Sequence, residues 1–320
     1  MNDNLIRGTE NSDILLGTFG NDEIVGLGGN DTIIGTAGTD TLNGGSGIDT
    51  VDYSSFLDKI TLLPQGVFRN GSGRNGQLVE IERIVAPFGF KNEIDAFTGR
   101  GGISLNVNLD AVSLVVNDVP GIGVQTFTVK NFINVKGTIE SDILIGDESD
   151  NLLIGVAGDD LIEGSGGNDT LRGGKGDDTL AGTDRIFRGA GEKDILLGNG
   201  LGTDTFILGD ETGSFYQGGG DRDLATIRHF GFGELIQLGA NETYTLENDN
   251  NGFKVFLTTE SQKDLIANVR LDSSITNSFA APQVLSLESG GQNEILMGQV
   301  PEGEFTIASG EIVGEIFMGA

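Results

Sequence analysis

The chain of 320 residues has no cysteine, no tryptophan and a single histidine, His229. Without cysteine, a disulfide framework and thiol catalysis are both excluded. One histidine also excludes the His-Glu-x-x-His zinc site of metalloproteases, which needs two. A Ser-His-Asp triad would have to use His229, and no nucleophile-elbow motif accompanies that residue. The sequence therefore predicts that the chain is not an enzyme, although paired-carboxylate chemistry stays open as an alternative.

Basic residues and long apolar runs are also scarce. Lysine and arginine number 19 against 48 aspartates and glutamates, which gives a formal charge of −29 at pH 7. Such a chain would repel phosphates, so a nucleic-acid partner is not expected. No apolar run approaches the roughly 20 residues that span a membrane as a helix. The first seven residues also lack the apolar core of a cleavable secretory signal.

Glycine is abundant, with 53 residues, and many of them recur with a fixed period. Aspartate, once replaced by asparagine, occupies every ninth position in two blocks: Asp13, Asp22, Asp31, Asp40 and Asp49, then Asp142, Asn151, Asp160, Asp169 and Asp178. An aliphatic residue follows each by two positions: Leu15, Ile24, Ile33, Leu42, Val51, Leu144, Leu153, Ile162, Leu171 and Leu180. A glycine precedes each by five positions. Three residue types locked to one period indicate a single repeated structural unit.

Nine residues suit a short strand joined to a six-residue turn. Glycine supplies the positive φ angles that the turn demands. The last three residues form a minimal strand whose middle aliphatic side chain points inward. Two units then make an 18-residue coil, and stacked coils bury a thin continuous core. We expect an all-β fold: a parallel β-roll, which is a β-solenoid, in two ladders joined by an irregular β-solenoid spacer and closed by a C-terminal β cap.

Stacked coils would place the aspartates in columns. Residues 18 apart lie one above the other, roughly 4.8 Å apart along a parallel ladder. Asp13, Asp31 and Asp49 then line one edge of the solenoid, and Asp22 and Asp40 line the other. Two carboxylates at this distance repel by roughly 1 to 3 kcal/mol, depending on how far water is excluded. Such columns need a cation, and oxygen ligands in flexible geometry favour Ca²⁺ over Mg²⁺.

The units resemble the Gly-Gly-x-Gly-x-Asp-x-U-x nonapeptides of RTX (repeats-in-toxin, hemolysin-type) calcium-binding proteins, of the kind common in cyanobacteria. The best matches are residues 26–34 and 173–181. The resemblance implies that the aspartate and turn carbonyls of one turn share Ca²⁺ with the turn one coil away. The implied pairs are Asp13/Asp31, Asp31/Asp49, Asp22/Asp40, Asp142/Asp160, Asp160/Asp178 and Asn151/Asp169. This stacking gives about six ions.

The metal-site residues that the resemblance implies are the aspartates, the asparagine and the turn glycines of both blocks. They are Gly8, Asp13, Gly17, Asp22, Gly26, Gly29, Asp31, Gly35, Gly38, Asp40, Gly44, Asp49, Gly137, Asp142, Asn151, Gly155, Asp160, Gly164, Gly167, Asp169, Gly173, Gly176, Asp178 and Asp194. Asn151 brings no charge, and Asn11 and Glu140 stand where the first unit of each block should have its inner glycine. Terminal repeats are commonly atypical in this way.

The loss of the period marks the expected boundaries. They separate a first repeat block at 1–52, a β-rich spacer at 53–136, a second block at 137–209, a β cap at 210–276 and an acidic-apolar tail at 277–320. We expect the spacer to continue the solenoid; the alternative is a small separate β domain. Phenylalanines are expected to pack the cap: Phe206, Phe215, Phe230, Phe232, Phe253 and Phe256.

The resemblance also implies a location and partners. RTX proteins are typically exported by a type I exporter through an uncleaved C-terminal signal, and the tail, which lacks lysine and arginine, is compatible with one. A capping strand or two is the alternative for the tail. We expect a secreted, extracellular or cell-surface protein that folds on binding Ca²⁺, with a structural, adhesive or surface-associated role. The rival hypothesis is an extracellular solenoid that binds or modifies polysaccharide, as a lyase or epimerase does.

Overall fold

The computed structural model describes residues 4–63, 67–70, 75–97, 101–198, 201–249, 251–259, 262–272, 283–289, 292–298, 307–308 and 311–312. The chain divides into two compact units, Met1–Leu144 and Ile145–Ala320. Of the expected tail at 277–320, the segments other than 283–289, 292–298, 307–308 and 311–312 lie outside the described residues.

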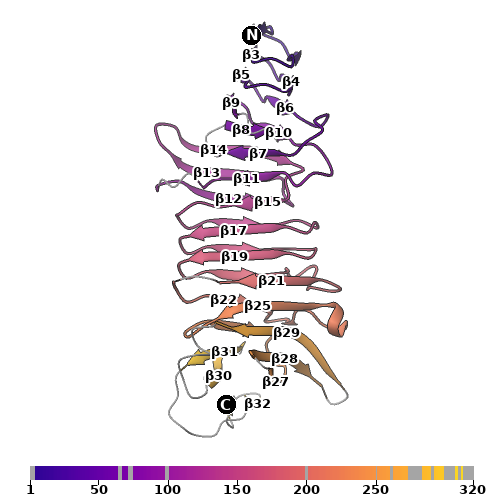
Figure 1. The fold of residues 1–320 in the computed structure, drawn as a ribbon, viewed down its shortest axis with the longest axis vertical. Coiled ribbons are helices and arrows are strands. Elements are labelled where there is room, and N and C mark those ends of the chain that lie inside the picture. Colours follow the sequence, from indigo (N-terminus) through magenta and orange to yellow (C-terminus); the bar gives the residue numbers. More distant parts are fainter. Residues whose placement is uncertain are drawn as a thin grey trace. The chain divides into compact units, whose positions relative to one another are not determined.

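The first unit consists of short strands on two sheets (Figure 1). One sheet contains β1 (Asn4–Arg7), β3 (Asp22–Gly28), β5 (Thr41–Ser46), β9 (Asn75–Val79), β8 (Val67–Asn70), β7 (Ile60–Leu63), β11 (Glu93–Asp95) and β15 (Asn134–Lys136), in this spatial order. The other contains β2 (Ile14–Leu16), β4 (Thr32–Ile34), β6 (Thr50–Asp52), β10 (Arg83–Val85), β14 (Gly123–Lys130), β13 (Ser113–Val119) and β12 (Ser104–Asn108). The chain alternates between the two sheets, as a solenoid requires.

The register of the first unit follows the 18-residue coil. Ile6 pairs with Ile24, Ile24 with Leu42, and Ile33 with Val51, all in parallel strands. Antiparallel hairpins interrupt this pattern after residue 52. Strands β7, β8 and β9 form one such detour, and β12, β13 and β14 form another. Parallel pairing continues on either side of each detour, through β6–β10–β14 and β7–β11–β15.

The second unit begins with the same architecture. One sheet has β17 (Leu152–Ala157), β19 (Thr170–Lys175), β21 (Lys193–Leu197), β25 (Leu224–Phe230), β29 (Lys263–Leu271), β28 (Gly252–Thr258) and β27 (Tyr244–Asp249). The other has β18 (Leu161–Glu163), β20 (Thr179–Ala181), β22 (Thr205–Ile207), β26 (Leu235–Leu238), β31 (Gln292–Gly298) and β30 (Gln283–Ser289). Pairing is parallel from β17 to β29 and from β18 to β26, and antiparallel beyond.

The remaining elements are short. They are β16 (Ile143–Ile145), β23 (Gly209–Asp210), β24 (Gly213–Ser214), the 3-10 helix η1 (Gly220–Arg222), β32 (Ile307–Ala308) and β33 (Glu311–Ile312). No α-helix occurs among the described residues. Accordingly, that part of the chain offers no helix with the length and hydropathy of a membrane span.

The core is the column of aliphatic side chains that the period predicts. All ten aliphatics of the repeat are buried, from Leu15 at 8% exposure to residues such as Ile33 and Leu171 at 0%. In the cap, Phe230 lies 6.0 Å from both Phe206 and Phe253, measured between ring centroids. Phe232, expected in the cap, is instead 37% exposed because it stands in the turn before β26. The expected fold, a parallel β-solenoid with a β cap, is confirmed.

Candidate metal centres

The repeat aspartates lie in the turns between the two sheets. In the first unit, the residues directly before β2, β4 and β6 are Asp13, Asp31 and Asp49. On the other side, Asp22 is the first residue of β3, and Asp40 directly precedes β5. The two groups therefore occupy opposite edges, as the 18-residue coil predicts. All of them except Asp13 are at most 3% exposed.

One oxygen of each stacked aspartate is tied to the preceding coil. The main-chain N–H of Asp13 donates to Oδ1 of Asp31 at 2.8 Å, and that of Asp31 donates to Oδ1 of Asp49 at 2.7 Å. On the other edge, the N–H of Asp22 donates to Oδ1 of Asp40 at 3.0 Å. The second unit repeats this contact in Asn151/Asp169 at 2.8 Å and Asp160/Asp178 at 2.9 Å. The structure thus brings together five of the six expected pairs.

In the aspartate that accepts each of these five contacts, the second oxygen is buried and accepts no hydrogen bond. The five are Asp31, Asp40, Asp49, Asp169 and Asp178. A buried carboxylate oxygen without a partner is costly, because it has given up water and gained nothing in return. A hard cation would compensate for this loss, and carboxylate oxygens are ligands that Ca²⁺ accepts readily. The residues present therefore fit the metal that the repeat implies.

Main-chain carbonyls converge on the same places as these oxygens. A Cβ built on Gly26 would lie 2.1 Å from Oδ2 of Asp31 and 2.3 Å from the carbonyl oxygen of Gly44, one coil away. A Cβ on Gly164 would lie 2.2 Å from Oδ2 of Asp169 and 2.3 Å from the carbonyl oxygen of Gly182. Only glycine allows this approach, and the result is an all-oxygen environment built from two successive turns.

The other repeat glycines have related roles. The first glycine of a unit lies against the Oδ2 atom of its own aspartate in Gly8, Gly17, Gly44, Gly155 and Gly173, and an added Cβ would meet it at 2.0 to 3.2 Å. Gly35 instead lies against the ring of Tyr53, and Gly137 is buried beside Thr138. The inner glycines have left-handed φ angles, in Gly29, Gly38, Gly167 and Gly176.

Burial disfavours the ionised form of several of these carboxyl groups and so raises their pKa values. It raises the pKa of Asp40 to about 6 and the pKa of Asp178 to about 7. Burial also raises the pKa of Asp169 to about 9, and the neighbouring charges of Asp194 and Glu192 add to that rise. The pKa of Asp194 is raised by burial to about 7. Without a cation, a fully ionised ladder is therefore unfavourable.

No group of three or more histidine, cysteine, aspartate or glutamate side chains that could hold a metal occurs among the described residues. This agrees with the geometry of the turns, since each turn contributes one aspartate and its remaining oxygens come from the main chain. Ligand sets of this kind depend on carbonyl groups, and calcium commonly uses them together with carboxylates.

Four expected positions differ from the regular pattern: Asp13, Asp22, Asp142 and Asn151. Oδ2 of Asp22 accepts from the N–H of Thr18 at 2.6 Å. Asp13 is partly exposed, and its Oδ2 accepts from the N–H of Thr9 at 2.6 Å. Asp142 receives hydrogen bonds on both oxygens, from the N–H groups of Leu105 and Thr138 at 2.6 Å each. Because Asp142 lies in the first unit and Asp160 in the second, the Asp142/Asp160 pair stays a prediction.

Asn151 is the neutral member of the second block, yet a charge stands beside it. Its Oδ1 accepts from the N–H of Asp147 at 2.9 Å, and its Nδ2 donates to Oδ1 of Asp147 at 3.2 Å. Asp147 thus supplies a carboxylate that the nine-residue pattern did not reveal.

The structure adds acidic residues to the columns that the sequence period missed. Oε2 of Glu82 accepts from the N–H of Asp49 at 2.8 Å, and Oδ1 of Asp204 accepts from the N–H of Asp178 at 3.1 Å. Asp194, which was expected, takes the same role toward Asp169 at 2.8 Å. These partners are 33, 26 and 25 residues apart rather than 18. The part of the repeat pattern that these positions keep is an acidic residue two positions before a buried core residue, as in Glu82 before Ile84.

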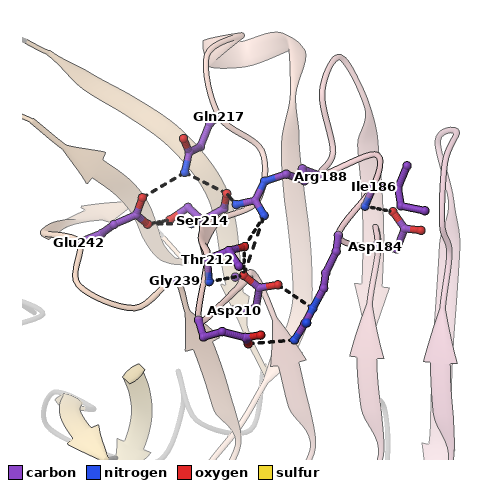
Figure 2. A network of polar contacts seen from close by, with 12 residues as sticks. Asp184, Ile186, Arg188, Asp210, Thr212, Ser214, Gln217, Gly239 and Glu242 are labelled. Atoms are coloured by element: carbon purple, nitrogen blue, oxygen red, sulfur yellow. Dashed lines mark hydrogen bonds and ion pairs between the residues drawn. The ribbon is translucent and has the colours of Figure 1, made fainter. Parts of the chain in front are cut away.

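A network of polar contacts outside the ladders lies around Asp210 (Figure 2). Nε of Arg185 lies 2.9 Å from Oδ2 of Asp210, and Thr212 donates to its Oδ1 through both its N–H and its hydroxyl. Burial alone would raise the pKa of Asp210, but these hydrogen bonds and the charges of Arg185 and Arg188 lower it overall. Hydrogen-bond donors and a guanidinium group therefore contact both oxygens of this carboxylate and stabilise its ionised form.

The same network includes a buried serine, Ser214 (Figure 2). Oε2 of Glu242 accepts from the N–H and the hydroxyl of Ser214, at 2.7 and 2.6 Å, and from the hydroxyl of Tyr244 at 2.7 Å. Gln217 donates to the other oxygen of Glu242 at 3.2 Å. These bonds fasten the turn at Ser214 to the segment around Glu242.

Comparison with known proteins gives one family. The sequence profile described as RTX calcium-binding nonapeptide repeat (4 copies) matches residues 2–26, 16–51, 136–171, 145–180 and 164–192. These segments cover nearly all of the first block, most of the second block and about a third of the chain. No curated protein sequence matches the chain.

Among solved structures, the chain is similar to the crystal structure of extracellular lipase LipA from Serratia marcescens. The two are 20% identical with a TM-score of 0.25, and the alignment covers 85% of this chain and 38% of the lipase chain. The chain therefore spans well under half of that structure, and similarity at this level carries no argument about activity. The matched profile, the nine-residue period and the paired turns together show that both blocks consist of RTX calcium-binding nonapeptide repeats, folded as a parallel β-roll.

Proposed function

We propose that the chain is a secreted protein whose ladders fold when they bind extracellular Ca²⁺, and that its role is structural, adhesive or surface-associated. The supporting observation is the set of five aspartates whose Oδ2 atoms are buried without a hydrogen bond. Ionised carboxylates in that position destabilise the metal-free ladder. Bound Ca²⁺ would supply the positive charge that these oxygens and the adjacent turn carbonyls lack.

The calcium-dependent segments are, on this proposal, the first block at 1–52 and the second at 137–209. Each turn would contribute one carboxylate and its main-chain carbonyls. Because such a site does not exist in the unfolded chain, the free energy of binding becomes free energy of folding. In a chain with a charge of −29, the two blocks would stay extended where Ca²⁺ is scarce and would fold where it is abundant.

Circular dichroism of the full chain tests the coupling. Spectra are recorded after removal of metal, then with millimolar Ca²⁺, and with Na⁺ at matched ionic strength to separate binding from charge screening. We expect the β signal to rise, as the two blocks change from coil to β, with Ca²⁺ only. A spectrum that is already fully β in the metal-free buffer would refute coupled folding.

A pair of variants locates the effect in the ladder. Asp31→Asn removes a buried carboxylate from the first column, and we expect Ca²⁺ to bind its block roughly tenfold more weakly, which corresponds to about 1.4 kcal/mol. Asp58→Asn removes an equal charge from an exposed position and should leave the calcium midpoint unchanged. Equal effects of the two substitutions would mean that net charge, and not the ladder, sets the midpoint.

Export by a type I system and an extracellular or cell-surface location are part of this proposal and rest on the behaviour of RTX proteins in general. Fusion of residues 277–320 to a passenger protein, in cells with and without a type I exporter, tests the tail directly. The rival polysaccharide hypothesis stays a prediction, which binding and lyase assays on acidic glycans address.

A further inference from the structure

Asn92 stands in the spacer at a position equivalent to the repeat aspartates. It is fully buried and lies two residues before the core residue Ile94. Its Oδ1 accepts from the N–H of Ile60 at 3.0 Å, one coil earlier in the parallel pair β7–β11. The same contact ties Oδ1 of Asp31 to Asp13 in the first ladder. Asn92 therefore accepts, through Oδ1, the same hydrogen bond from the preceding coil that a ladder aspartate accepts.

The other side-chain atom of Asn92 performs a different task. Nδ2 donates to the carbonyl oxygens of Pro87 at 2.8 Å and Asn131 at 2.7 Å, with a longer contact to that of Phe90 at 3.4 Å. Pro87 precedes Asn92 by five residues, as Gly26 precedes Asp31. Three carbonyls from two successive turns thus surround an N–H₂ group. The orientation of the amide is fixed, because its flipped form would point an oxygen at three acceptors.

A second amide joins the same two turns. Nδ2 of Asn131 donates to the carbonyl oxygen of Ala86 at 2.8 Å, and the N–H groups of Ile133 and Asn134 donate to the carbonyl oxygen of Asn92 at 3.2 and 3.1 Å. The turns therefore satisfy their own carbonyl groups. In the described part of 53–136, no carboxylate oxygen is both buried and without a hydrogen-bond partner.

We propose that the Asn92 amide takes the place of the cation, so that the spacer coil from Ala86 to Lys136 is closed and stable without Ca²⁺. In the ladders, carboxylate and carbonyl oxygens converge on a point that lacks positive charge. In the spacer, the partial positive charge of N–H₂ stands among the carbonyls. This inference goes beyond calcium-coupled folding, because it assigns to the spacer a metal-independent fold and names the residue responsible.

The proposal predicts that a carboxylate at position 92 restores a need for metal. Asn92→Asp preserves the side-chain shape but turns an oxygen toward the carbonyls of Pro87 and Asn131, which repel it. A divalent cation relieves that repulsion, since four oxygens then converge on it. Asn92→Ala removes both the donor and the acceptor, and Ca²⁺ cannot replace either.

Hydrogen exchange of the full chain tests this directly, in metal-free buffer and in millimolar Ca²⁺ at matched ionic strength. In the natural chain we expect peptides from 83–97 and 127–136 to be equally protected in both buffers. In Asn92→Asp their protection should fall at least about tenfold without metal and return with Ca²⁺. In Asn92→Ala it should be low in both buffers.

Three outcomes would overturn the proposal. One is loss of spacer protection in the natural chain when Ca²⁺ is removed. The others concern Asn92→Asp: protection that is equal with and without Ca²⁺, or protection that Ca²⁺ fails to restore. Failure of coupled folding would look different, because peptides from the two repeat blocks would then stay protected without metal while the spacer results still decide the role of Asn92.

Discussion

At the scale of the residue, a ladder aspartate serves two neighbours with its two oxygens. In Asp31, Asp40 and Asp49, Oδ1 accepts a main-chain N–H from the preceding coil, and Oδ2 is left for a cation. The sequence predicted the residue type, the columns and the metal. It did not predict which oxygen would be hydrogen-bonded, because that depends on the offset between coils rather than on composition.

Gly26 provides a prediction at this scale. In Gly26→Ala, the new methyl group would overlap Oδ2 of Asp31 and the carbonyl oxygen of Gly44, so we expect a loss of about 1–3 kcal/mol from overpacking and a higher Ca²⁺ midpoint. Urea denaturation in saturating Ca²⁺ measures the first effect and a calcium titration the second. Gly231→Ala is the control, since its nearest neighbour would lie 3.6 Å away; equal losses in both variants would show that the site is not the cause.

At the scale of the element, the nine-residue unit is predictable only where its period is intact. Turn and strand alternate too regularly in 8–52 to allow another register, because a shift of one residue would expose every aliphatic. The antiparallel detours β7–β8–β9 and β12–β13–β14 were not predicted, since they lie where the period is lost. The first of these detours is also the reason why the pairing of Glu82 with Asp49 was not predicted. It separates by 33 residues two groups that lie one coil apart.

Tyr216 shows how an element outside the repeat closes a column. Its buried hydroxyl donates to Oδ2 of Asp194 at 2.6 Å, so this carboxylate needs no cation on that side. Tyr216→Phe should destabilise the Ca²⁺-bound second unit by about 1–3 kcal/mol, because it leaves a buried acceptor unsatisfied. The same substitution in an Asp194→Ala background should cost little, and chemical denaturation of the four proteins measures the coupling. A full loss in both backgrounds would assign the effect to packing of the ring.

At the scale of the whole molecule, the acidic composition makes stability depend on protons and on calcium in opposite ways. Burial raises the pKa of Asp40, Asp178, Asp194 and Asp169 in the folded chain, to about 6, 7, 7 and 9, from 3.8 when exposed. Carboxyls with raised pKa values stabilise the folded state fully below the unfolded value of 3.8, and that stabilisation is lost as the pH rises through the folded values.

In the metal-free chain, the balance between folded and unfolded ladders should therefore shift toward the unfolded state as the pH rises from about 4 to about 9, most steeply near the pKa values of Asp40, Asp178 and Asp194. Saturating Ca²⁺ should flatten this dependence, because it favours the ionised carboxylates, and calcium affinity should rise with pH. Circular dichroism across this pH range, recorded with and without saturating Ca²⁺, gives the pH dependence of folding in both conditions. Light scattering guards against precipitation near the isoelectric point of about 4.1. Stability that rises with pH in the metal-free chain would contradict the burial of these carboxyls as ionisable groups.

The hydrogen bonds between successive ladder aspartates run in one direction, and this gives each column of aspartates a polarity. The N–H of one coil donates to the carboxylate of the coil that follows, in Asp13 to Asp31 and Asp31 to Asp49. Each coil is thus completed by its successor, and Glu82 and Asp204 complete the last members of their columns. A block shortened from its N-terminal side keeps the N–H of every remaining ladder aspartate paired with a carboxylate, whereas one shortened from its C-terminal side does not. Repeats can therefore be added or removed in steps of 18 residues ahead of a fixed closing residue, and the length of the roll can vary while its end stays the same.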